Sequence, residues 1–335
     1  MCFNAGIREV IWKYLLKSVI ASLLFLLISL PAFSDAIVIP FETLWQVDNN
    51  ETIEITTYNY ASIRPKVTID WGDGHTEKFV SPQTRGLWEN ETTIKHTYIN
   101  KGLYKVKIYF VDSLIRFDNQ SALKSVLNWG NYGCFAVHGI FQNSGLERID
   151  AQGQPNCEDF TGVFYMAKHF NDDLNHWDMS EVTRISSLFF GAEKFNGDIS
   201  SWDTSKVEYA TSTFNNARSF NRDISQWNTK SLIRAEYLFS GANQFNQDLS
   251  GWDLTKLTDI DSLFYKAKSF KGPLPKFDFN HITYVRNAFY GVRLLKEDLS
   301  DWNTDHIRYC YHFVNPEDHQ FILPSFKNCS IAGTK

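Results

Sequence analysis

Aspartate and serine recur every 25 residues in the second half of the chain, and they are the side chains best suited to binding chemistry. These positions are Asp173, Asp198, Ser200, Asp223, Ser225, Asp248, Ser250, Asp298 and Ser300. Stacked carboxylates could attract a basic partner, bind calcium, or accept hydrogen bonds from their own backbone. Local backbone bonding is the favoured interpretation, because like charges on neighbouring units repel unless each is satisfied. If the segment faces solvent, this Asp/Ser surface is the candidate binding site.

Histidine and the common catalytic motifs add little chemistry to these columns. His281 and His306 lie 25 residues apart, but two histidines are too few ligands for a metal site. The chain contains no HExxH, GxSxG, P-loop or Rossmann glycine pattern. We therefore predict no catalytic residues, no metal site and no cofactor.

An aromatic repeat with the same period positions the aspartates and serines. Its two columns are Trp177, Trp202, Trp227, Trp252, Phe277 and Trp302, and Phe189, Phe214, Phe239, Phe264 and Phe289. A constant period of this length is typical of stacked repeats, in which neighbouring units bury each other's apolar faces. We expect both columns to form the core of the stack. The alternative is that the tryptophans form an exposed strip that stacks on sugars.

Each repeat is predicted to contain one short strand and one short helix. Residues 198–202 are β-prone, and helical spacing follows at Val207, Ala210, Phe214 and Ala217. The sequence therefore predicts an α/β solenoid of leucine-rich-repeat type, with short parallel strands and short helices. A further column is predicted to bond the backbone of neighbouring turns, and it consists of Asn171, Asn196, Asn221 and Asn246. Pro273 and Pro275 predict a local break, because proline lacks an N–H group.

A different pattern precedes the repeats, over residues 37–112. Apolar and polar residues alternate in 53–56, 67–71 and 104–110, which is typical of half-buried strands. The sequence predicts a small all-β sandwich of immunoglobulin type. Asp70 and Asp73 hint at a metal, but carboxylates that cap the turn are the favoured interpretation.

Two resemblances accompany these patterns. The segments IDWGDG (69–74), HTY (96–98) and GLYKV (102–106) resemble PKD domains, which implies an immunoglobulin-like spacer or adhesive module. The repeat pattern FN-x-D-[IL]-S-x-W-[DN]-x-[ST]-x-[VL], followed by LF-x-GA, resembles the BspA-like leucine-rich-repeat surface proteins. That resemblance implies an exported or surface protein with a role in adhesion, and it brings no catalytic residues.

The remaining segments complete the predicted organisation. Residues 1–34 have the basic, apolar and small-residue regions of a secretory signal peptide, with an uncleaved anchor as the alternative. We predict degenerate entry repeats or an N-terminal cap over 113–158, the regular array over 159–315, and a cap or tail over 316–335. The even number of cysteines after the leader favours two disulfides, Cys134–Cys157 and Cys310–Cys329. The alternative for Cys310 is a buried thiol.

Charge and composition narrow the class of partner. The net charge is −5 and the sequence has no basic run, so nucleic acid is a poor partner. We expect an exported, non-enzymatic surface or secreted binding protein whose repeat face contacts a protein or a glycan. Its expected location is the cell surface or the extracellular space, with the periplasm as the alternative, and no span remains after signal removal. The alternative function is a self-assembling structural component of an envelope or matrix.

Overall fold

The computed structural model describes residues 39–58, 66–80, 91–111, 114–130, 138–292, 298–315 and 322–329. The chain divides into two units, 1–38 and 39–335, and all described residues belong to the second. The predicted signal peptide lies outside the described residues. Within them, no helix with the length and apolar character of a membrane span is found.

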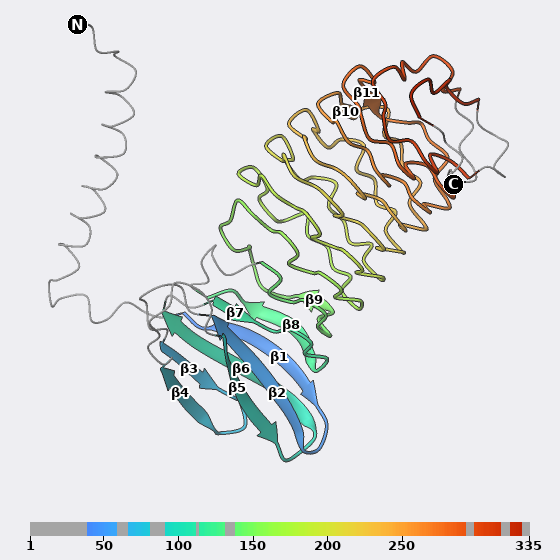
Figure 1. The fold of residues 1–335 in the computed structure, drawn as a ribbon. Coiled ribbons are helices and arrows are strands. Elements are labelled where there is room, and N and C mark those ends of the chain that lie inside the picture. Colours follow the sequence, from blue (N-terminus) through green and yellow to red (C-terminus); the bar gives the residue numbers. More distant parts are fainter. Residues whose placement is uncertain are drawn as a thin grey trace, which may run out of the picture. The chain divides into compact units, whose positions relative to one another are not determined.

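Nine strands build the first part of this unit, and eight of them form a β-sandwich (Figure 1). They are β1 (Phe41–Val47), β2 (Glu51–Tyr58), β3 (Lys66–Asp70), β4 (Thr76–Val80), β5 (Glu91–Tyr98), β6 (Gly102–Val111), β7 (Leu114–Arg116), β8 (Leu123–Asn128) and β9 (Arg148–Ile149). One sheet has the order β4-β3-β6-β1-β8-β9 and the other has the order β5-β2-β7. Alternating side chains such as Ile53, Ile55, Val106 and Ile108 are buried in one core.

The larger sheet carries the chain from the sandwich into the repeats. β8 pairs antiparallel with β1 in the sandwich and parallel with β9, where Val126 lies opposite Ile149. The backbones approach closely here, because a Cβ atom on Gly145 would lie 2.0 Å from the carbonyl oxygen of Ser121. Only glycine fits this position without a shift of the backbone.

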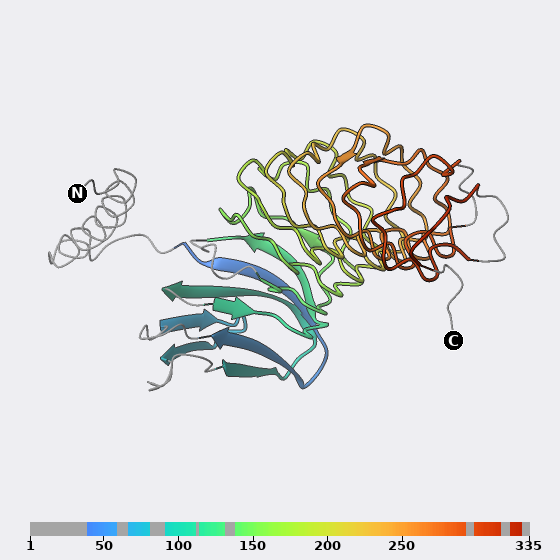
Figure 2. The ribbon, with the colours of Figure 1, turned by 45° about the horizontal axis from the view of Figure 1, so that its top comes forward.

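The repeats form coils that lie side by side in one stack (Figures 1 and 2). Each coil consists mainly of turns, and the only paired strands in the regular array are β10 (Asp253–Leu254) and β11 (Lys276–Phe277). Single parallel bridges otherwise link successive coils, and they join Asp159 to Arg184, Arg184 to Tyr209, Tyr209 to Arg234, Asp259 to Tyr284, and Tyr284 to Tyr309.

The predicted α/β solenoid of leucine-rich-repeat type is wrong, because the described residues contain strands and turns but no helix. Every second N–H group donates to the next coil, at 2.7 to 2.9 Å for Ser212, Phe214 and Asn216. The N–H groups between them close turns onto the residue three positions back, at 3.0 to 3.2 Å. Inward-facing residues therefore recur about every three to four positions, which mimics the spacing of an amphipathic helix.

Left-handed residues at two positions in each coil prevent a helix from forming. One column consists of Ser187, Ser212, Tyr237, Ser262, Asn287 and His312, and the other consists of Met166, Gly191, Asn216, Gly241, Lys266 and Gly291. All have φ between 51° and 78°. A right-handed helix requires negative φ, so the chain turns at both positions and never completes a helical hydrogen-bond ladder. The strand prediction was also misplaced, since the bridges fall at Tyr209 rather than within 198–202.

Two phenylalanine columns fill the core of the stack. In the first, rings from Phe117 to Phe289 have neighbouring centroids 5.5 to 6.0 Å apart. The second column runs from Phe170 to Phe270 at 5.8 to 6.0 Å. Within a coil the two rings stack at 3.7 to 4.4 Å. Each ring thus contacts its own coil and both neighbours, and a buried Phe side chain contributes about 1.5–3 kcal/mol.

The tryptophans are packed inside the stack rather than displayed as an exposed strip. Trp177, Trp202, Trp227 and Trp252 are at most 5% exposed. Trp202, Trp227 and Trp252 stack at 5.9 to 6.0 Å, and their Nε1 atoms donate to the preceding coil at 2.8 to 3.1 Å. The Nε1 atom of Trp177 is buried without a hydrogen-bond partner. Phe277 and Trp302 are only half-buried.

The predicted asparagine ladder is confirmed. The side-chain oxygens of Asn171, Asn196 and Asn221 accept the N–H groups of the asparagines 25 residues later, at 2.8 to 2.9 Å. The ladder continues from Asn246 to the N–H group of Lys271 at 3.0 Å. These bonds fix the distance between successive coils at their exposed edge.

The proline-containing coil remains bonded to the coil before it. Leu249 N–H donates to the Pro273 carbonyl at 3.4 Å, and Lys276 N–H donates to the Trp252 carbonyl at 2.9 Å. The predicted break is therefore not seen on this side of the coil.

A disulfide joins Cys310 to Cys329 at the end of the described chain, as predicted. Cys157 is buried, and its predicted partner Cys134 lies outside the described residues.

The tryptophan column allows a matched measurement of one hydrogen bond. Trp202→Phe and Trp177→Phe remove similar volume from similar depth, but only the first removes a hydrogen bond, while the second removes an unsatisfied donor. We expect Trp202→Phe to lower the free energy of unfolding by about 1–3 kcal/mol more than Trp177→Phe. Denaturant titration followed by circular dichroism measures both values. Equal losses would contradict a role for the indole donors.

Candidate functional site

The predicted Asp/Ser surface is occupied by local hydrogen bonds. The Oδ1 atoms of the five aspartates accept the N–H group two residues later, at 2.8 to 3.0 Å, for Asp173, Asp198, Asp223, Asp248 and Asp298. The donors are Asn175 and the serines of the predicted site, Ser200, Ser225, Ser250 and Ser300. The structure thus places each Asp/Ser pair in its own turn.

Hydrogen bonds within these turns also keep the aspartates ionised. The Ser200 N–H group lowers the pKa of Asp198. The hydroxyl and then the N–H group of Ser250 lower the pKa of Asp248, and Ser300 acts in the same way on Asp298. One oxygen of each carboxylate is committed to the backbone. These turns therefore explain the aspartates without a ligand.

A second surface, which the sequence did not single out, lies along the parallel bridges. We call it the ladder face, and it comprises Asp159, Arg184, Tyr209, Arg234, Asp259, Tyr284 and Tyr309, with Thr161, Ser186, Thr211, Glu236, Asp261, Arg286 and Tyr311 two residues after them. Residues two apart on an extended segment point to the same side. Aromatic and charged groups are therefore presented in two adjacent rows.

Arg286 is the centre of a tyrosine cluster on this face. Its Nε atom donates to Oδ2 of Asp261 at 2.5 Å, and its N–H group donates to Oδ1 at 2.6 Å. The guanidinium carbon lies 5.6, 5.8 and 5.7 Å from the ring centroids of Tyr284, Tyr309 and Tyr311. Hydrogen bonding to Asp261 raises the pKa of Arg286. Asp261 is 3% exposed, so a buried carboxylate holds the guanidinium in place.

Three tyrosines expose much of their surface on or beside this face. Tyr237, Tyr309 and Tyr311 are 42%, 44% and 42% exposed. Tyr309 stacks on Tyr284 with ring centroids 4.7 Å apart and an interplanar angle of 3°. The rings are therefore both accessible and held by their neighbours.

Three carboxylates lie at the middle of the ladder face. Within the continuously described stretch 138–292, no bridge joins Arg234 to Asp259, although the bridges on either side are present. Burial raises the pKa of Asp259 to about 6, and the charges of Asp261 and Glu236 act in the same direction. Glu236 also contacts Arg234 and accepts a hydrogen bond from Thr211 at 2.7 Å. Repulsion among the carboxylates accounts for the gap in the ladder.

Asp159 has the opposite environment at the first coil of the ladder face. Burial raises its pKa, but hydrogen bonds from His138 and Thr161 outweigh burial and lower the pKa to about 2. His138 lies 3.2 Å from its carboxylate and Arg184 lies 3.8 Å away. Asp159 is therefore ionised across the physiological range.

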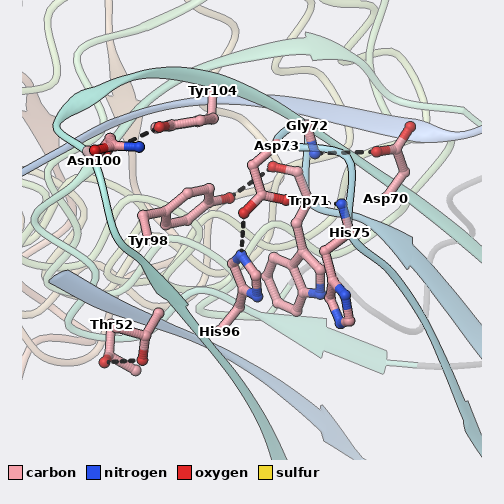
Figure 3. Close-up of polar contacts among 11 residues, drawn as sticks. Thr52, Asp70, Trp71, Gly72, Asp73, His75, His96, Tyr98, Asn100 and Tyr104 are labelled. Carbon is pink, nitrogen blue, oxygen red and sulfur yellow. Dashed lines mark hydrogen bonds and ion pairs between the residues drawn. The ribbon is translucent and has the colours of Figure 1, made fainter. Parts of the chain in front are cut away.

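The sandwich contains a separate polar cluster around Trp71 (Figure 3). The His96 ring lies between those of Trp71 and His75, with centroids 4.7 and 5.3 Å away. Asp73 binds Nε2 of His96 at 2.7 Å and accepts the His75 N–H group at 3.0 Å. The backbone hydrogen bond and His96 together lower the pKa of Asp73 against the effect of burial.

These contacts confirm that Asp70 and Asp73 cap the turn, since Asp70 likewise accepts the Gly72 N–H group at 3.0 Å. Among the described residues, no group of three or more His, Cys, Asp or Glu side chains is placed to hold a metal ion. The cluster locks the turn between β3 and β4 to β5.

The ladder face could have been found in the sequence from its variable columns. The regular columns drew attention because they repeat, and the structure uses them for core packing and turn capping. The columns of Tyr209 and Thr211 change chemistry from coil to coil, which is what a recognition surface requires. Tyrosine at 284, 309 and 311 beside Arg286 was the available signal.

The opposite pKa shifts of Asp259 and Asp159 predict opposite pH dependence. The pKa of folded Asp259 is about 6 against an ordinary 3.8, so its contribution to stability is lost as pH rises from 4 through 6. Asp259→Asn keeps the oxygen that accepts the Asp261 N–H group and cannot ionise. We expect this variant to have a higher Tm than the wild type at pH 8 and an equal Tm below pH 4.

Asp159→Asn is the matched control for this measurement. The pKa of Asp159 is lowered, so its contribution is present above pH 4 and is lost as pH falls towards 2. The control should therefore have a lower Tm than the wild type at pH 7. Scanning calorimetry from pH 3 to pH 8 tests both variants. A Tm difference for Asp259→Asn that does not change with pH would contradict the assignment.

Comparison with known proteins places the repeats in a family. A family model described as "Mycoplasma protein of unknown function, DUF285" matches residues 136–250 and again 225–319, which together span more than half of the chain. No curated protein and no solved structure matches the chain. The overlapping matches follow the stacked coils from the entry region to the last described aromatic coil. The chain therefore belongs to the DUF285 family.

Proposed function

We propose that this protein is an exported, non-enzymatic binding protein and that its ladder face contacts another protein. The observation that carries this proposal is the cluster of exposed tyrosines around Arg286, which is itself held by buried Asp261. Tyrosine and arginine are enriched in protein interfaces and in their energetic hot spots. The Asp/Ser surface is not part of this proposal, because its carboxylates are bonded within their own turns.

The rigidity of the cluster favours binding. An exposed tyrosine offers a large amphipathic surface with few rotatable bonds. The stacking of Tyr309 on Tyr284 and the ion pair between Arg286 and Asp261 restrict these side chains before a partner arrives. Little side-chain entropy is then lost on association, so more of the contact energy appears as affinity.

The charge pattern of the ladder face favours a protein over nucleic acid. Arg184 and Arg234 alternate with the acidic groups Asp159, Glu236 and Asp259 along the stack. A phosphate backbone requires a continuous basic stripe, which this face lacks. A protein surface with its own mixed charges can match such a pattern.

Two features support export. The first is the signal-like sequence of residues 1–34. The second is the disulfide between Cys310 and Cys329, since disulfides persist mainly in oxidising compartments. The cell surface and the extracellular space are therefore the proposed locations.

Binding of the full mature chain to a panel of purified extracellular matrix proteins, measured by biolayer interferometry, tests this function. We expect at least one partner, and we expect Tyr309→Ala combined with Tyr311→Ala to weaken its binding at least tenfold. Loss of a hot-spot side chain costs about 2 kcal/mol or more, which exceeds a tenfold change. Both side chains lie outside the apolar core, so circular dichroism should show an unchanged fold.

Ser225→Ala combined with Ser250→Ala is the matched control on the Asp/Ser surface. Their N–H groups still cap Asp223 and Asp248, so the turns remain and binding should not change. Absence of any partner, or equal binding by the tyrosine variant, would refute the proposal. Concentration-dependent light scattering that the tyrosine variant abolishes would instead assign this face to self-assembly.

A further inference from the structure

An open groove lies between the proline-containing coil and the coil after it. Its volume is 470 Å³, and its lining includes Lys276, Phe277, Asp298, Asp301 and Trp302. Small-ligand sites typically measure about 300–1,000 Å³ and combine aromatic walls with a few polar groups. The groove is thus large enough for a small ligand, and it lies away from the tyrosine cluster of the ladder face.

The groove arises where the tryptophan column changes. Phe277 takes the position that tryptophan occupies in the four preceding coils, and the smaller ring leaves space. Trp302 does not stack parallel to it, since their interplanar angle is 67°. Trp302 stacks instead on Phe279, with ring centroids 3.8 Å apart. Its indole is consequently half-buried, and its exposed part lines the groove.

The indole N–H group of Trp302 is free to bind a ligand. In Trp202, Trp227 and Trp252 this group donates to a carbonyl 28 residues earlier in the chain. Within the described part of the chain, the Trp302 Nε1 atom makes no such hydrogen bond. Phe279 fixes the ring and the groove exposes its donor.

The polar groups at the rim divide into committed and uncommitted ones. Asp278 accepts hydrogen bonds from Asn280 and pairs with His281 at 2.7 Å, so both of its oxygens are used. The side chain of Asn303 donates to Asn280 across the two coils at 2.7 Å. These contacts brace the groove rather than serve a ligand.

Uncommitted donors and acceptors face the groove together. Asp301 and the second oxygen of Asp298 can accept hydrogen bonds, while Lys276 and the Trp302 indole can donate them. A ligand with hydroxyl groups satisfies both kinds at once. A cationic ligand would be attracted by the carboxylates and the indole, but it would meet the ammonium group of Lys276 at close range.

We propose that this groove binds a neutral sugar residue of a glycan. The C–H face of the sugar lies against Trp302, where the partial negative charge of the ring face attracts it. The sugar hydroxyls accept from the indole N–H group and from Lys276, and they donate to Asp298 and Asp301. The open form of the groove allows the rest of a glycan chain to extend from it. This site is separate from the ladder face and does not depend on the function proposed there.

A printed array of defined neutral oligosaccharides, probed with the full mature chain and followed by isothermal titration calorimetry of the best ligand, tests the proposal. We expect Trp302→Ala to weaken binding at least tenfold. Trp302→Phe keeps an aromatic ring but removes the N–H donor, so we expect a smaller loss of about threefold to tenfold. Saturation-transfer NMR should show the sugar C–H protons, rather than a reducing-end tag, closest to the protein.

Tyr309→Ala is the matched control, because it removes an exposed aromatic ring from the ladder face and leaves the groove intact. Its sugar affinity should equal that of the wild type, which separates this proposal from the one on protein binding. Absence of sugar binding by the wild type would overturn the assignment, as would unchanged binding in Trp302→Ala. Preference for a lysine-rich peptide over every sugar would overturn it in favour of a cationic ligand.

Discussion

Contact between a side chain and its own copy 25 residues later is the interaction on which this structure depends. Parallel backbone segments lie about 4.8 Å apart. The phenylalanine rings are 5.5 to 6.0 Å apart at their centroids, so they are offset as they stack. An insertion in one coil would place a ring against a polar neighbour and break two contacts at once. The period is therefore held constant wherever the rings are stacked.

This constraint separates the columns that face inward from those that face outward. Phe214 and its copies cannot change without disturbing the coils on both sides, whereas Tyr209, Arg234, Asp259 and Tyr284 occupy one outward column with different chemistry in each coil. The inward columns supply a scaffold, and the outward columns can be chosen for a partner. A repeat protein can in this way build a surface from residues that no single repeat contains.

The period, the aromatic core and the asparagine ladder were accessible from the sequence, because each depends on one residue type at one spacing. The helix was wrong because turns of three residues place Val207, Ala210, Phe214 and Ala217 inward at nearly helical intervals. Serine, tyrosine and lysine occupy several of the left-handed positions, so glycine did not mark them all. Hydrogen bonds between coils stabilise these conformations, and such bonds are not visible in a single repeat. The ladder face was missed because its columns vary.

The coil that contains Pro273 and Pro275 shows how such a stack can acquire a site at small cost. Its bonds to the preceding coil remain, through the Pro273 carbonyl and the Lys276 N–H group. Because each coil contacts only its neighbours, a smaller ring at Phe277 alters only the space next to it. Trp302 rotates onto Phe279, while Phe264 and Phe289 keep their stacking at 5.6 Å on the other side of the coil. The same nearest-neighbour packing that keeps the core regular therefore confines a departure to one groove.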